Sequence, residues 1–156
     1  MIKDANLVLN PVLCRYSNLF PYDSSRVVVQ GPPGDSDYVN ASSVSVPGVV
    51  HRIILAMGPL HPDYHGQDTV ATFWRMVRQQ EVGQVVMLCQ VQLLLSPAFR
   101  MLMSSILQVQ AGYGGCSGYF PGPGDTVEHG GVTVEGRREE RGEARVVRRL
   151  HLGLGG

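Results

Sequence analysis

The sequence predicts a mixed α/β domain of the α+β kind, with a partial mixed sheet and one clear helix. Several short β-branched runs are separated by clusters of Gly and Pro, a pattern typical of strands joined by turns. One longer segment, residues 69–80, carries apolar side chains with helical spacing. The length of 156 residues is that of one ordinary domain, so we expect a single core.

The first predicted strands lie in the N-terminal half. Residues 27–29 are β-branched and are closed by a Gly and Pro turn at residues 30–34. Residues 38–39 then restart an extended pattern. Residues 49–50 and 53–55 together form a third apolar run, which a Gly-Pro pair closes. These runs predict the beginning of a sheet.

The predicted helix over residues 69–80 has one apolar face. Its apolar residues follow the i, i+3, i+4, i+7 spacing of a single helical face, and they are Val70, Phe73, Trp74 and Val77. Asp68 or Thr69 is expected to cap the first turn, because a side-chain oxygen there can accept a hydrogen bond from a free backbone N–H group. The apolar face requires a sheet to cover it.

The second half of the chain predicts further strands. Residues 85–88 form a continuous apolar run, typical of a central strand covered on both faces. Residues 132–134 and 146–147 are predicted as two short strands, joined by the charged residues 136–143. After residue 147 we expect no further element. Between these groups, residues 98–108 could form a short amphipathic helix.

Composition argues against several classes of protein. Thirteen Lys and Arg residues balance thirteen Asp and Glu residues, so net charge gives no reason to expect a nucleic-acid partner. The arginines of residues 137–149 alternate with glutamates, which favours a solvated hairpin. The three cysteines, Cys14, Cys89 and Cys116, fit neither a disulfide framework nor a Cys-x-x-Cys site. We expect a reducing, cytoplasmic setting.

No metal, cofactor, signal peptide or membrane segment is expected. His61, Asp63 and His65 have spacing suited to a metal, but nothing supplies the other half of a site, so a solvated loop is favoured. Asp4 interrupts the N-terminal segment where a signal peptide needs an apolar core. Pro, Arg and Ser residues interrupt the longest apolar run, residues 91–109.

Four motifs, taken in order, resemble the front half of a protein tyrosine phosphatase domain, and of the receptor-type members in particular. Cys14-Arg15-Tyr16 is similar to the family's Asn-Arg-Tyr, and Asp37-Tyr38-Val39-Asn40-Ala41-Ser42 to its Asp-Tyr-Ile-Asn-Ala-Asn. Met57-Gly58-Pro59-Leu60 resembles Gln-Gly-Pro-Leu, and Phe73-Trp74-Arg75-Met76-Val77 resembles Phe-Trp-Arg-Met-Val. The resemblance implies an incomplete tyrosine-phosphatase-like fold.

The resemblance divides the chain into three parts. We expect residues 1–156 to be one partial tyrosine-phosphatase domain, with firm similarity over residues 10–91 and weaker similarity over residues 111–152. Residues 92–110 look inserted or atypical, as an intron-derived segment would. The helices that open the family domain are expected to be absent upstream of residue 10.

The resemblance also implies site residues and a partner. Tyr16 would stack on the phenyl ring of a phosphotyrosine, and Asn18 would hydrogen-bond the substrate backbone. The residues that the resemblance implies as structural are Arg15, Asp37, Tyr38, Asn40, Gly58, Pro59, Phe73 and Trp74. The implied partner is a phosphotyrosine protein or peptide, and the implied location is cytoplasmic, within the intracellular part of a receptor-type parent.

The family's chemistry needs a thiolate with an arginine six residues later and a Trp-Pro-Asp general acid. Six residues after the three cysteines stand Phe20, Leu95 and Gly122, and Trp74 is followed by Arg75. We therefore predict no catalytic residue and expect the chain to stop before both motifs. Three interpretations stay open: an inactive domain fragment, a phosphotyrosine- or partner-binding module, and an unstable truncated gene product.

Overall fold

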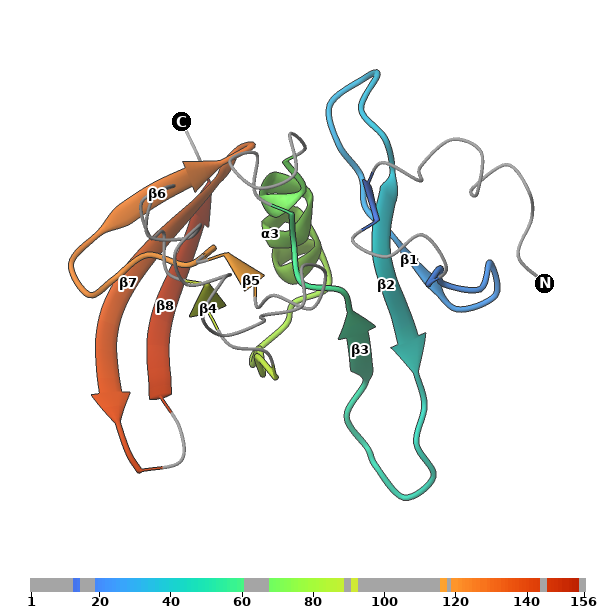
Figure 1. Ribbon diagram of the computed structural model, residues 1–156. Helices are drawn as coiled ribbons and strands as arrows, with labels where there is room; N and C mark the ends of the chain where they lie inside the picture. The colour runs from blue at the N-terminus through green and yellow to red at the C-terminus, as the bar shows by residue number, and fades with distance from the viewer. Residues whose placement is uncertain are drawn as a thin grey trace, which may run out of the picture.

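The computed structural model describes residues 13–14, 19–60, 68–88, 91–92, 116–117, 119–143 and 146–154, with the backbone alone at 91–92 and 116–117. Within these residues one helix, α3 (Val70–Gln79), lies between two three-stranded antiparallel sheets (Figure 1). A third sheet consists of two parallel strands, β4 (Val91–Gln92) and β5 (Cys116–Ser117). The predicted mixed α/β class, with partial sheets and one clear helix, is confirmed.

The first sheet has the order β1 (Arg26–Val28), β2 (Tyr38–Val44), β3 (Ile53–Ala56), so all three strands match predicted runs. The prediction that residues 49–50 continue the third run is wrong. A Pro-Gly turn stands there, closed by a 3.0 Å hydrogen bond from the Val49 N–H to the Val46 carbonyl, and Val50 is 96% exposed. The Pro-Gly pair therefore forms a turn here, although Val49 and Val50 are residue types that favour strands.

Helix α3 begins as predicted. The Asp68 carboxylate accepts a 2.8 Å hydrogen bond from the Val70 N–H group, so Asp68 provides the expected capping oxygen. The Thr69 hydroxyl instead accepts a 2.8 Å bond from the Leu60 N–H, which fixes the incoming chain beside the helix. The buried residues of α3 are Val70, Phe73, Trp74, Met76 and Val77.

The second sheet has the order β6 (Thr126–His129), β7 (Val132–Arg141), β8 (Val146–Leu154). It corrects two expectations and contains one strand that was not predicted. Residues 136–141, predicted as part of a connection, continue β7, because their charged side chains pair with one another and across to β8. The unpredicted strand is β6, whose residues are mostly polar. β8 continues to Leu154, beyond the predicted end at residue 147.

Residues 85–88 are not a strand, so the prediction of a central strand there is wrong. Val85, Val86 and Leu88 are 44%, 66% and 94% exposed. An apolar run becomes a central strand only where neighbouring strands offer hydrogen-bond partners on both sides, and within the described residues β3 pairs with β2 alone. The helix predicted over residues 98–108 lies outside the described residues.

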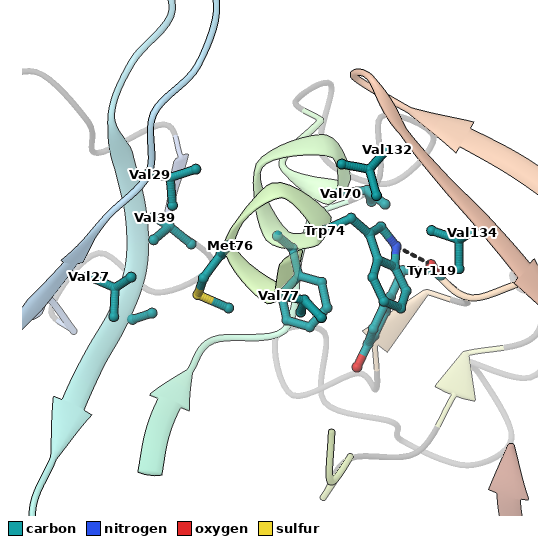
Figure 2. Close-up of a cluster of buried hydrophobic side chains, with 12 residues drawn as sticks. Val27, Val29, Val39, Val70, Trp74, Met76, Val77, Tyr119, Val132 and Val134 are labelled. Carbon is teal, nitrogen blue, oxygen red and sulfur yellow. Dashed lines mark hydrogen bonds between the residues drawn. The ribbon is translucent and has the colours of Figure 1, made fainter. Parts of the chain in front are cut away.

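The core is continuous from one sheet through α3 to the other. Figure 2 shows Val27, Val29 and Val39 of the first sheet region on one side of the helix, and Val132 and Val134 on the other. Trp74 is 2% exposed and packs edge-to-face with Phe73, with ring centroids 5.4 Å apart. The helix is therefore the element on which both sheets pack.

Candidate functional site

Strand β2 provides the two side chains around which the candidate site is arranged. Tyr38 and Asn40 are two residues apart on one strand, so they project from the same face of the sheet. Tyr38 is 3% exposed, and Asn40 is partly buried. β2 is the central strand of its sheet, and the Asn40 carbonyl accepts a 2.9 Å hydrogen bond from the Met57 N–H. Both side chains thus stand on well-supported backbone.

These two side chains hold the chain near residues 14 and 19. The Tyr38 hydroxyl lies 3.0 Å from the Cys14 sulfur. The Asn40 amide nitrogen donates one hydrogen bond of 2.7 Å to the Leu19 carbonyl and another of 3.3 Å to the Cys14 sulfur. One amide group therefore bonds to two points that flank residues 15–18.

The surroundings of Tyr38 keep its phenol neutral. Burial raises the pKa of Tyr38 far above its ordinary value, and the hydrogen bond with Cys14 raises it further, while the charge of Arg26 opposes the shift. Arg26 itself forms a 3.0 Å ion pair with the carboxylate of Asp37, the residue before Tyr38. At neutral pH the Tyr38 hydroxyl is accordingly a hydrogen-bonding group without charge.

A small cavity of about 20 Å³ lies beside Tyr38 and Asn40, large enough for about one water molecule. It collects most of the residues predicted as structural. The lining residues are Leu13, Tyr38, Val39, Asn40, Met57, Gly58, Pro59, Thr69, Thr72 and Phe73. The cavity is too small for a substrate side chain, and the bracing role that the resemblance implies for these residues stays a prediction.

Trp74 lies elsewhere, in the core. Its indole N–H donates a 2.8 Å hydrogen bond to the Tyr119 carbonyl, drawn as the dashed line in Figure 2. The Tyr119 ring also packs edge-to-face on Phe73, with centroids 5.0 Å apart. The two aromatic residues of the helix motif thus fix residues 119–120 against α3.

Arg15, Tyr16 and Asn18, three of the residues singled out in the sequence, lie outside the described residues. Their immediate neighbours Cys14 and Leu19 are described, and the contacts of both with β2 were not predicted. The alternation of Tyr38 and Asn40 indicates a shared face, but no spacing rule connects that face to a cysteine and a carbonyl more than twenty residues upstream.

The environment of Cys14 is not that of a catalytic nucleophile. The thiol is buried, and within the described residues its hydrogen-bonding contacts are the hydroxyl of Tyr38 and the amide of Asn40, both of them neutral. A reactive thiolate is usually stabilised by a nearby cation or a helix N-terminus and is reachable by substrate. We therefore interpret Cys14 as a residue that packs in the interior and forms hydrogen bonds.

Neither a metal centre nor a membrane span is found in the described part of the chain. No cluster of three or more His, Cys, Asp or Glu side chains could hold an ion there. The histidine and aspartate residues at 61, 63 and 65 lie outside it. No described helix has both the length and the apolar character needed to cross a bilayer.

A larger groove of about 720 Å³ opens between β3, α3 and residues 82–88. Its lining is mainly apolar. On one wall are Leu55 and Ala56 of β3, and on the other Val86 and Leu88. Phe73, Met76 and Val77 of α3 also contribute to it. The exposed apolar residues noted at 85–88 therefore belong to one surface feature.

Comparison with known proteins identifies the family. The sequence profile of the protein-tyrosine phosphatase family matches residues 10–154. The chain is 32% identical to receptor-type tyrosine-protein phosphatase V of Rattus norvegicus over 135 residues, 84% of this chain and 6% of that protein. It is 42% identical to receptor-type tyrosine-protein phosphatase alpha of Homo sapiens over 76 residues, 47% of this chain and 9% of that protein.

A non-receptor member is similar as well. Tyrosine-protein phosphatase non-receptor type 4 of Mus musculus is 28% identical over 142 residues, which are 88% of this chain and 12% of that protein. The chain thus spans well under a fifth of the length of each of these relatives. On the strength of the family profile and the motifs of β2 and α3, the chain belongs to the protein-tyrosine phosphatase family.

Proposed function

We propose that this chain is a partial tyrosine-phosphatase domain that does not hydrolyse phosphotyrosine on its own. The observation that carries this proposal is that none of its three cysteines has an arginine six residues later. Hydrolysis by the family mechanism needs the thiolate, the phosphate cradle and the general acid together. Loss of the nucleophile from such a unit removes nearly all turnover, because the remaining parts do not substitute for it.

The test is hydrolysis of an aryl phosphate by the purified chain. We expect a rate equal to the buffer blank. The matched control is the chain with Cys14, Cys89 and Cys116 all replaced by Ser, which separates thiol chemistry from a contaminating phosphatase. Hydrolysis by the unmodified chain that disappears in the triple variant would refute the proposal.

A second candidate function is recognition of a phosphotyrosine protein or peptide without hydrolysis. In this proposal the ring of Tyr16 stacks on the phosphotyrosine ring and Asn18 hydrogen-bonds the peptide backbone. The contacts of Cys14 and Leu19 with Tyr38 and Asn40 support it, because they attach both flanks of residues 15–18 to the central strand of a sheet. A recognition loop needs such a rigid base.

Peptide titration tests this second function. A phosphotyrosine peptide should bind more tightly than its unphosphorylated form, and Tyr16→Ala should weaken binding about 2- to 12-fold, the value of one stacked ring pair. Tyr22→Ala is the control, because Tyr22 is 61% exposed and stands outside residues 15–18. No measurable binding at millimolar peptide would dismiss this function.

The third interpretation, an unstable gene product, makes the opposite prediction about folding. Residues 85–88 and β3 leave apolar surface exposed, which favours aggregation. Against this, α3 packs on both sheets through a continuous core. We infer that the chain folds, and expect a cooperative thermal transition with a monomeric elution profile. A featureless melt with aggregation would favour the unstable product.

We also propose the boundaries and the location of this domain. Residues 1–156 form one partial domain, with firm family similarity over residues 10–91 and weaker similarity over residues 111–152. Residues 92–110 are an insertion of intron origin, and the protein resides in the cytoplasm as the intracellular part of a receptor-type parent. Support comes from the atypical composition of residues 92–110 and from the receptor-type relatives. Sequencing the transcript through the codons of residues 92–110 tests the insertion, and imaging a tagged parent protein tests the location.

A further inference from the structure

Strand β8 forms an open edge of the second sheet. It is nine residues long, and among the described residues it pairs with β7 alone (Figure 1). Exposed apolar side chains stand at both of its ends, where Val146 and Leu154 are 47% and 72% exposed. A long edge strand of this kind presents unpaired backbone groups and can serve as a template for another strand.

The direction of the free backbone groups of β8 follows from Gly136 of β7. The N–H and carbonyl groups of Gly136 bond to the backbone of Asp125 and Gly124, so they point away from β8. Gly136 is paired with Leu150, and the N–H and carbonyl groups of Leu150 must therefore point outward, away from β7. Because these directions alternate along a strand, every second residue of β8 presents its backbone groups to the open edge. These residues are Val146, Arg148, Leu150, Leu152 and Leu154.

We propose that the open edge of β8 pairs with the same edge of a second copy of this chain, in an antiparallel arrangement centred on Leu150. Leu150 then lies opposite Leu150 of the other copy, and the two residues exchange hydrogen bonds through their outward groups. The same register places Val146 opposite Leu154, so the exposed apolar side chains at the ends of the strand cover one another. The two three-stranded sheets become one continuous sheet.

Two-fold symmetry restricts the register of such a pair. An axis perpendicular to the sheet keeps each side chain on its own face, so residues with outward groups on one copy meet residues with outward groups on the other. Centring on Leu150 aligns β8 over its full length. Every other permitted register shortens the pair and separates Val146 from Leu154. The distribution of exposed apolar residues therefore selects the register centred on Leu150.

The arginines of β8 do not oppose this pairing. The guanidinium of Arg148 donates a 2.6 Å hydrogen bond to the Glu139 carboxylate and lies 4.4 Å from the centre of the Phe120 ring. Its charge is therefore compensated within its own chain. Arg149 lies on the other face of the strand, opposite His151 of the second copy, and both side chains are exposed. Water and salt screen the interaction between these two exposed groups.

The pair should be weak and should stop at two copies. One pair of strands buries less surface than the roughly 1,200 Å² of a stable interface, so we expect a dissociation constant between about 10 µM and 1 mM. In dilute gel filtration the chain therefore elutes as a monomer. The edge of β8 is fully used in the pair, and the other edge of this sheet, β6, is only four residues long.

Sedimentation velocity at chain concentrations from about 10 µM to 2 mM tests the pairing. We expect the average mass to rise from that of one chain toward that of two. Leu154→Lys should raise the dissociation constant roughly 2- to 30-fold, because it disrupts both symmetric contacts with Val146. Val127→Lys is the matched control, since it adds the same charge at an exposed position of the opposite edge strand, β6, and should leave the constant unchanged. A mass that stays that of one chain, or equal effects of the two substitutions, would overturn the proposal.

Cysteine cross-linking tests the register. The Cα atoms of residue 149 and of residue 151 in the other copy should lie about 4.5 Å apart, within reach of a disulfide bond. Two copies of residue 149, or two of residue 151, face each other diagonally at roughly 7 to 8 Å, which is too far.

The chains for this test carry Cys89→Ser and Cys116→Ser, and the buried Cys14 is kept. A mixture of Arg149→Cys and His151→Cys chains, oxidised with copper phenanthroline, should form cross-linked dimer several-fold faster than either variant alone. Equal rates in the mixture and in the single variants would refute the two-fold pairing centred on Leu150.

Discussion

Single glycines decide how closely segments approach in this protein. Gly136 of β7 lies at a register shift of the β7–β8 ladder, and its N–H and carbonyl bond to the backbone of Asp125 and Gly124. A Cβ at this position would overlap the carbonyl oxygen of Gly122. Gly136→Ala should therefore lower the free energy of unfolding by about 1 to 3 kcal/mol, measured by urea denaturation, because backbone on both sides prevents relaxation.

Gly153 provides the matched control for this prediction. It lies in β8, and a Cβ there would be in ordinary contact with the Thr133 Cβ at 3.7 Å. Gly153→Ala should leave the free energy of unfolding within about 0.5 kcal/mol of the parent, or raise it slightly, since alanine loses less backbone entropy on folding. Equal losses at the two positions would mean that strand propensity, and not the close approach to Gly122, governs Gly136.

At the scale of elements, helix α3 contributes to stability by packing its buried side chains against both sheets. Trp74→Phe removes the 2.8 Å hydrogen bond to the Tyr119 carbonyl and leaves a space in the core. The free energy of unfolding should fall by about 1 to 3 kcal/mol. Arg78→Ala, on the exposed side of the same helix, should change it by less than about 0.5 kcal/mol. Similar losses for both variants would argue that helix propensity, and not core packing, sets the stability.

The β7–β8 hairpin predicts a dependence of stability on pH. Partial burial tends to raise the pKa of the Glu139 carboxyl, but hydrogen bonds of 2.6 Å each from Arg141 and Arg148 hold that pKa below its ordinary value of 4.5. A carboxyl whose folded pKa is depressed stabilises the fold above the unfolded pKa, and this contribution is lost as pH falls through the folded value. Glu139→Gln should therefore be less stable than the parent at pH 7.

The difference should narrow as pH falls below 4.5, because the parent then loses the same charge. Denaturant titrations at several pH values measure this directly. Thr126→Ala, at an exposed position of β6 that carries no ionisable group, is the control and should give a difference that does not vary in this way. A Glu139→Gln difference that is constant from pH 7 to below pH 4 would contradict the ion-pair explanation.

The elements also show what sequence patterns can and cannot predict here. The helix and the strands β1, β2 and β3 follow local rules, a 3.6-residue apolar repeat and β-branched runs bounded by turns, and the structure confirms them. The charged half of β7 does not follow them, because it is stabilised by pairing across to β8, which the sequence of β7 alone does not reveal. The strand predicted at residues 85–88 is wrong because an apolar run forms a strand only beside a partner strand. The described residues provide no partner strand there.

The candidate site likewise contains a part that sequence motifs predicted and a part that they did not. Motif order indicated Tyr38, Asn40, Gly58, Pro59 and Phe73 as bracing residues, and they gather around one small cavity. The bonds from Tyr38 and Asn40 to residues 14 and 19 could not be predicted, because they join distant segments through side chains that follow no periodic rule. The recognition roles of Tyr16 and Asn18 stay predictions.

At the scale of the whole molecule, the described residues leave a large groove open between β3, α3 and residues 82–88. It offers about 720 Å³ with mainly apolar lining, and Leu55 and Leu88 in its walls are 62% and 94% exposed. Exposed apolar surface of this kind binds amphiphilic dyes such as anilinonaphthalene sulfonate. The native chain should therefore enhance the dye's fluorescence without any denaturant, and Leu88→Glu should reduce the enhancement by half or more.

Val50→Glu distinguishes the groove from apolar exposure in general. Val50 is 96% exposed, as much as Leu88, but it stands in the turn before β3 and does not line the groove. Because a dye needs a concave apolar surface and not one isolated side chain, Val50→Glu should leave the fluorescence unchanged. Equal reductions in the two variants would show that the dye responds to added charge, and the groove would then have no binding capacity of its own.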